Sequence, residues 1–88
     1  MNETMTMTVL LFGACREAAG TSEFRLELDG AGKSLSVASA FAEIKRRYPA
    51  LERFERSALF AVNEEHARQQ DQLRDGDTLA IFPPVSGG

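Results

Sequence analysis

The last six residues of the chain, PPVSGG at positions 83–88, have the residue types best suited to a chemical role. Pro83 and Pro84 favour an extended, stiff backbone, so the segment is expected to project from the domain. Six residues at about 3.3 Å each span nearly 20 Å, which is enough to enter the active site of another protein. Gly87 and Gly88 have no side chains and can pass through a narrow channel. The segment therefore predicts a C-terminal carboxylate at Gly88 that is presented to a partner.

That carboxylate would need activation before it could react. A carboxylate is a poor electrophile until one of its oxygens becomes part of a leaving group, and adenylation by ATP achieves this. Sulfur transfer to the acyl adenylate would then give a thiocarboxylate, whose anionic sulfur is a competent nucleophile. Adenylation followed by sulfur transfer is therefore one chemical route by which a free C-terminal carboxylate could become reactive.

The other reactive side chains predict no catalytic site in the body of the protein. Cys15 is the only cysteine, and lone cysteines usually pack as small apolar groups. His66 lies in a polar stretch, and one cysteine with one histidine falls short of a zinc ligand set. The spacing of Asp71, Asp75 and Asp77 does not match a calcium-binding loop. We expect no metal and no permanently bound cofactor.

Composition and charge favour one small globular domain. The chain has 88 residues, of which 43% are hydrophobic and 26% charged. A net charge of −3 argues against nucleic acid or an anionic membrane as the main partner. Apolar runs stay far below the roughly 20 residues that cross a membrane. The N-terminus does not resemble a signal peptide, and a single cysteine favours a reducing, cytoplasmic location.

Hydrophobic periodicity predicts the elements that position this tail. One long helix is expected at 37–48, because its apolar residues fall on a single stripe, Ser36 is a natural N-cap and Pro49 prevents continuation. A helical turn should end at Gly20. Strands are expected at 5–12, 24–28, 58–63 and 78–82, and a solvated polar loop with Leu73 as its one apolar anchor at 64–77.

The order strand, strand, helix, strand, strand favours an α+β domain. One helix packed on one face of a four-stranded sheet buries the helix's single apolar stripe. We expect this domain to span residues 1–82, with 83–88 as an extended tail. The basic run Lys45-Arg46-Arg47 falls at the expected helix C-terminus, where cations complement the helix dipole, although contact with an acidic partner stays open.

Three segments together resemble the small sulfur-carrier subunit of molybdopterin synthase. They are VLLFGACREAAG near the start, AVNEE, and LRDGDTLAIFPPVSGG at the end. The last segment is the specific one, because related sulfur carriers and ubiquitin-like modifiers share the diglycine but usually lack Phe-Pro-Pro. The resemblance implies a β-grasp, ubiquitin-like fold: a mixed four- to five-stranded sheet, one main helix across one face, the first and last strands parallel, and a flexible diglycine tail.

The same resemblance implies the partners and the reaction. An adenylating enzyme, which binds and uses the ATP, would load sulfur onto Gly88 through a transient adenylate and leave a thiocarboxylate. The large catalytic subunit of molybdopterin synthase would then accept the tail, which consists of Pro83, Pro84, Val85, Ser86, Gly87 and Gly88. Sulfur would pass to a cyclic pyranopterin phosphate to form the molybdopterin dithiolene, with two loaded carriers used in turn. The complex would be a heterotetramer of two small and two large subunits, and this chain would be its non-catalytic sulfur donor.

Two other functions stay open at this point. The chain could carry sulfur for thiamine, cysteine or tRNA thiolation, or it could be a ubiquitin-like modifier that forms isopeptide bonds through Gly88. A docking surface for the large subunit is also expected, because apolar residues occur at both parities of the strands and one helix covers only one face. We predict that Phe12, Phe60 and Phe82 form this surface beside the base of the tail.

Overall fold

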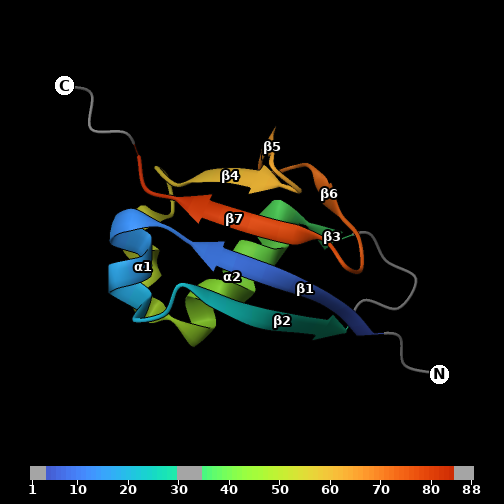
Figure 1. The fold of residues 1–88 in the computed structure, drawn as a ribbon, viewed down its shortest axis with the longest axis horizontal. Helices are drawn as coiled ribbons and strands as arrows, with labels where there is room; N and C mark the ends of the chain where they lie inside the picture. Colours follow the sequence, from blue (N-terminus) through green and yellow to red (C-terminus); the bar gives the residue numbers. More distant parts are fainter. Residues whose placement is uncertain (1–3, 30–34, 85–88) are drawn as a thin grey trace.

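The computed structural model describes residues 4–29 and 35–84, and its centre is a mixed five-stranded sheet (Figure 1). The elements in chain order are β1 (Thr4–Leu11), α1 (Gly13–Ala19), β2 (Glu23–Asp29), β3 (Leu35–Ser36), α2 (Val37–Arg47), the 3-10 helix η1 (Pro49–Phe54), β4 (Leu59–Val62), β5 (Glu65–Ala67), β6 (Gln72–Leu73) and β7 (Thr78–Phe82). The four predicted strands and both predicted helical segments are present, with bounds shifted by a residue or two.

The strand order in the main sheet is β2-β1-β7-β4-β5. The first and last strands are parallel neighbours, with Leu10 beside Ala80 and Leu11 beside Ile81. β2 and β4 run antiparallel to them on either side. This is the β-grasp arrangement that the resemblance implied, so the predicted fold class is confirmed with five strands in the main sheet.

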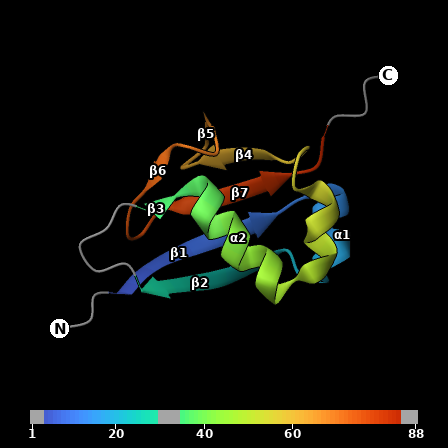
Figure 2. The same ribbon diagram turned by 180° about the vertical axis from the view of Figure 1, so that it is seen from behind.

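Helix α2 crosses one face of the sheet (Figure 2). It begins where predicted, because the Ser36 hydroxyl accepts a hydrogen bond of 3.1 Å from the Ser39 N–H and so caps the first turn. It ends at Arg47, before Pro49. The chain then forms η1 instead of an irregular loop. Proline is compatible with the first position of a new helical segment, where an N–H has no partner to lose.

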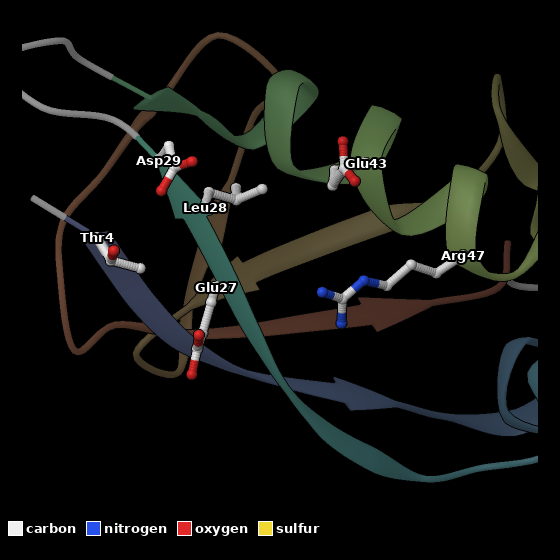
Figure 3. Close-up of a pocket in the computed structure, with 6 residues that line it drawn as sticks. All are labelled: Thr4, Glu27, Leu28, Asp29, Glu43 and Arg47. Atoms are coloured by element: carbon white, nitrogen blue, oxygen red, sulfur yellow. The ribbon is translucent and has the colours of Figure 1, made fainter. Parts of the chain in front are cut away.

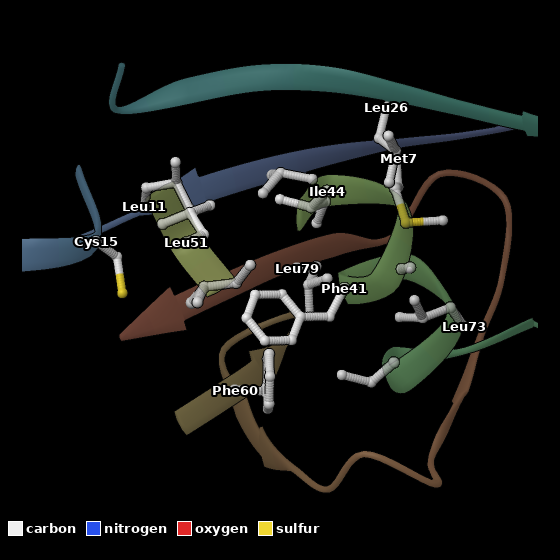
Figure 4. Packing of buried hydrophobic residues seen from close by; sticks show 14 of the residues in the cluster. Met7, Leu11, Cys15, Leu26, Phe41, Ile44, Leu51, Phe60, Leu73 and Leu79 are labelled. Atoms are coloured by element: carbon white, nitrogen blue, oxygen red, sulfur yellow. The ribbon is translucent and has the colours of Figure 1, made fainter. Parts of the chain in front are cut away.

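The core lies between α2 and the sheet (Figure 4). Phe41 and Ile44 are 3% and 0% exposed and belong to one buried cluster with the strand residues that face them. Those strand residues are Met7, Val9, Leu11, Leu26, Phe60, Leu79 and Ile81. The single apolar stripe predicted for this helix therefore packs on the first and last strands.

The polar segment at 64–77 is not a plain loop, and this part of the prediction is wrong. It forms β5, which pairs with β4, and β6, which pairs with β3 in a separate two-stranded sheet. Ala67 and Leu73 are buried and fasten the segment to the core. Because the segment has few apolar residues, hydrophobic periodicity did not predict its pairing with β4 and β3. Within residues 4–29 and 35–84, no helix is both long and apolar enough to cross a membrane.

Candidate functional site

The tail leaves the domain at the end of β7, beside the start of α1 (Figure 1). Two contacts fix this point. The Phe12 N–H donates a 3.1 Å hydrogen bond to the Ile81 carbonyl. The rings of Phe12 and Phe82 stack with centroids 4.6 Å apart and planes within 8°. Pro83 and Pro84 follow directly, whereas residues 85–88, which include the predicted reactive Gly88, lie outside the described residues.

An apolar patch surrounds this exit on the sheet face opposite α2. Among the described residues, Phe12 and Leu59 are the exposed large hydrophobic side chains, at 41% and 40% exposure. Leu59 lies directly opposite Phe82 in the β4–β7 pair, so the two side chains point to the same face. We call Phe12, Leu59 and Phe82 the tail-base patch. Two of its members were predicted from the sequence.

Phe60 does not belong to this patch, and the expectation that it is exposed is wrong. Its side chain is 3% exposed, and its ring meets Phe41 edge-on with centroids 5.2 Å apart (Figure 4). Phe60 is paired with Ile81, which faces the core, while its neighbour Leu59 is paired with Phe82, which does not. Successive strand residues point to opposite faces, so this register leaves the Leu59 side chain on the exposed face of the sheet. Residues 58–62 are apolar at every position, so the sequence carried no signal that would select Leu59 over Phe60 for the exposed face.

Cys15 and His66 lie on different sides of the molecule, in α1 and β5 (Figure 1). The Cys15 side chain is 0% exposed. Burial raises the pKa of the Cys15 thiol, and the nearby Arg53 guanidinium lowers it by a smaller amount. His66 is exposed and paired with Ala61. In the described part of the chain, no three His, Cys, Asp or Glu side chains gather in a way that could hold a metal ion.

The aspartates of the Asp-Gly-Asp turn have structural partners. The Asp75 carboxylate accepts a 2.7 Å hydrogen bond from the Thr6 N–H. Asp77 accepts from the Asn63 side-chain amide at 3.0 Å, while the Asn63 side-chain oxygen accepts from the Thr78 N–H at 3.0 Å. These bonds tie the β4–β5 turn to the start of β7. The AVNEE and RDGD segments therefore position the strand that carries the tail.

A polar groove opens between β2 and α2, at the opposite end of β1 from Phe12 (Figure 3). It is lined by Thr4, Glu27, Leu28, Asp29, Glu43 and Arg47. Three carboxylates and one guanidinium make it a charged surface feature. It is separate from the tail-base patch, so the candidate site consists of the patch and the chain that leaves beside it.

Comparison with known proteins agrees with this fold and identifies the family. The ThiS family model matches residues 9–88. The molybdopterin synthase sulfur carrier subunit of Chlamydomonas reinhardtii is 41% identical, with 96% of this chain and 100% of the relative covered. The human protein of the same name is 32% identical, with 91% of each chain covered. The crystal structure of SAMP1 from Haloferax volcanii superposes with a TM-score of 0.81 at 33% identity, covering 94% of this chain and 99% of SAMP1.

The matches extend over nearly the whole chain, from the first strand through the end of the tail. They include all three segments on which the resemblance was based. The chain therefore belongs to the ThiS family, with relatives that are named molybdopterin synthase sulfur carrier subunits.

Proposed function

We propose that this chain is the sulfur-carrier subunit of a molybdopterin synthase and that Gly88 carries the sulfur. The observation that supports this most is the 41% identity to a sulfur carrier subunit that is covered over its full length. The structure adds a compact body with a proline-stiffened exit beside an exposed apolar patch. A carrier needs such a body to be recognised and such a tail to be consumed and recharged.

The chemistry at Gly88 proceeds in two steps on the activating partner. The carboxylate attacks the α-phosphate of ATP, and pyrophosphate leaves as the acyl adenylate forms. A sulfur nucleophile supplied by that partner then attacks the acyl carbon, and AMP leaves with the bonding electrons. The thiocarboxylate sulfur then bonds to a carbon of a cyclic pyranopterin phosphate in the large subunit, and water cleaves the remaining acyl–sulfur bond so that Gly88 returns as a carboxylate. Catalytic side chains come from the partners, and residues 83–88 reach their active sites.

The tail-base patch is the proposed docking surface for the large subunit. A contiguous exposed apolar patch on a soluble domain often marks an interface, and Phe12, Leu59 and Phe82 adjoin one another. The patch adjoins the exit of the tail, so a partner that covers Phe12, Leu59 and Phe82 receives Pro83 and Pro84 at its edge. We propose a heterotetramer of two small and two large subunits, and a cytoplasmic location on the basis of the single, buried cysteine.

The test is to incubate the protein with the adenylating enzyme, ATP and a sulfur donor and then weigh the intact chain. Loading replaces one oxygen of the Gly88 carboxylate by sulfur, and the mass of the intact chain rises accordingly. Deleting Gly88, or adding residues after it, should abolish loading and leave thermal stability nearly unchanged. Gly87→Val should impair transfer, because a β-branched side chain does not fit a channel built for glycine. Loading of a tail-extended protein would overturn the assignment to Gly88.

Two control variants separate the tail from the body. Cys15→Ser and His66→Ala should both load normally, since the thiol is buried and the imidazole lies on β5. If Cys15→Ser abolished loading while the domain stayed folded, the sulfur would be held by the thiol and not by Gly88. Co-purification with a pterin-binding large subunit separates molybdopterin synthesis from the thiamine, cysteine and tRNA pathways.

A second candidate function is protein modification. It is favoured by the 33% identity to SAMP1, and a further solved structure from the same organism is named small archaeal modifier protein 1. Both functions begin with adenylation of Gly88, and they differ in the nucleophile that attacks next. Adducts that link Gly88 to lysines of other proteins in cells would support modification, whereas a thiocarboxylate and a co-purifying large subunit support the sulfur carrier.

A further inference from the structure

Gly13, the first residue of α1, lies against the first proline of the tail. Its φ is +55°, in the left-handed region that favours glycine. A Cβ placed on Gly13 would be 3.1 Å from Cγ and 3.5 Å from Cδ of Pro83. The shorter distance is tighter than an ordinary van der Waals contact, so any side chain at this position pushes on the proline ring. The absence of a side chain at Gly13 allows the ring its observed place.

The residues that directly precede Gly13 and Pro83 are also in contact. Phe12, just before Gly13, stacks on Phe82, just before Pro83. The backbones are also joined, because the Phe12 N–H donates to the Ile81 carbonyl at 3.1 Å. The Phe12 carbonyl in turn accepts from the Cys15 N–H at 3.1 Å, in the first turn of α1. Two consecutive residues at the start of α1 therefore hold two consecutive residues at the exit of the tail.

We infer that these four residues, Phe12 and Gly13 with Phe82 and Pro83, form an exit clamp, and that Gly13 is a positioning residue for loading of the tail. The inference rests on the proposed function. Five residues, the number that follows Pro83, span at most roughly 17 Å, and over that reach a rotation of about 10° corresponds to a displacement of about 3 Å. A misplacement of about 1 Å can cost a hundredfold in rate, so the direction of the exit matters for the reaction at Gly88.

Gly20 provides a matched control at the other end of the same helix. Its φ is +78°, so an alanine there meets a similar backbone penalty, but nothing lies within 4 Å of the added Cβ. The experiment measures kcat and KM for sulfur loading of the wild type, Gly13→Ala and Gly20→Ala, together with thermal unfolding. Both variants should lose stability through the positive φ, and Gly13→Ala should lose somewhat more because its Cβ also meets the Pro83 ring. Only Gly13→Ala should lower kcat, by about tenfold or more, at an unchanged KM, because docking of the body is intact.

A substitution at Pro83 tests whether the loss of kcat in Gly13→Ala arises from contact with the proline ring. Pro83→Ala removes Cγ and Cδ, the atoms that a Cβ at Gly13 would meet. In the Pro83→Ala background, Gly13→Ala should therefore change kcat by less than about twofold, whatever Pro83→Ala does alone. An equal loss of kcat on Gly13→Ala in both backgrounds would overturn the clamp. Equal losses of kcat in Gly13→Ala and Gly20→Ala would overturn it too.

Two further measurements distinguish failure of the proposed function from failure of the clamp. Failure of the wild type to load at all refutes the proposed function and is seen before any variant is compared. NMR of the wild type should show nuclear Overhauser contacts between the Gly13 α-protons and the Pro83 ring. Their absence overturns the clamp even if Gly13→Ala does not fold.

Discussion

Leu59 and Phe60 are neighbours in β4 whose side chains lie on opposite faces of the sheet, and the same substitution should have opposite consequences at the two positions. Leu59 is 40% exposed and belongs to the tail-base patch, whereas Phe60 is 3% exposed in the core. We expect Leu59→Asp to leave the domain folded and to weaken binding of the large subunit strongly. We expect Phe60→Asp to unfold the domain.

The magnitudes follow from burial. Loss of the buried Phe60 ring costs about 3–5 kcal/mol, and leaving a carboxylate among Phe41 and its neighbours costs several more. A chain of this length has a free energy of unfolding of only about 4–13 kcal/mol. At Leu59 only part of a leucine's burial, worth about 1.5–3 kcal/mol when complete, is at stake. The weak strand preference of aspartate adds up to about 1 kcal/mol, so most of the stability is left.

The assay combines thermal denaturation, followed by circular dichroism, with titration of the large subunit. For Leu59→Asp we expect a cooperative transition and binding at least about thirtyfold weaker, as at a central interface residue. Normal binding by Leu59→Asp would refute the docking role of the tail-base patch. A cooperative, native-like transition for Phe60→Asp would refute the assignment of Phe60 to the core.

Three further outcomes test the core, a turn and an ion pair. Phe41→Ala should lower the free energy of unfolding by about 3–5 kcal/mol in urea titrations, and a loss below about 1 kcal/mol would contradict its burial. Asn63→Ala should cost about 1–2 kcal/mol in the same titrations, because it removes the side-chain bonds to the start of β7 and places alanine at a φ of 52°. The hydrogen bond from Lys45, at 2.6 Å, lowers the pKa of Glu55. The contribution of this pair to the free energy of unfolding is therefore complete above the ordinary carboxylate pKa and is lost as the pH falls through the lowered pKa. Lys45→Met should flatten this part of the stability–pH curve, and an unchanged curve would contradict the pair.

Much of the fold could be predicted because local rules and burial agree along most of the chain. The stripe that includes Phe41 and Ile44, with Ser36 before it and Pro49 after it, permits one helix with one buried face. The predictions failed where local composition and tertiary pairing conflict. The segment 64–77 is polar, and its backbone forms β5 and β6 because β4 and β3 offer partners for its hydrogen bonds.

The sequence alone determined the tail, its diglycine and the resemblance that names its chemistry, because these depend on residue type and order. It also determined that the body holds one helix on a sheet. Only the tertiary structure decided which apolar side chains are left for a partner. The parallel register of β1 and β7 brings Phe12 onto Phe82, and the pairing of β4 with β7 sends Leu59 outward and Phe60 inward. A shift of one residue exchanges the two faces of a strand, so only the observed register could assign them.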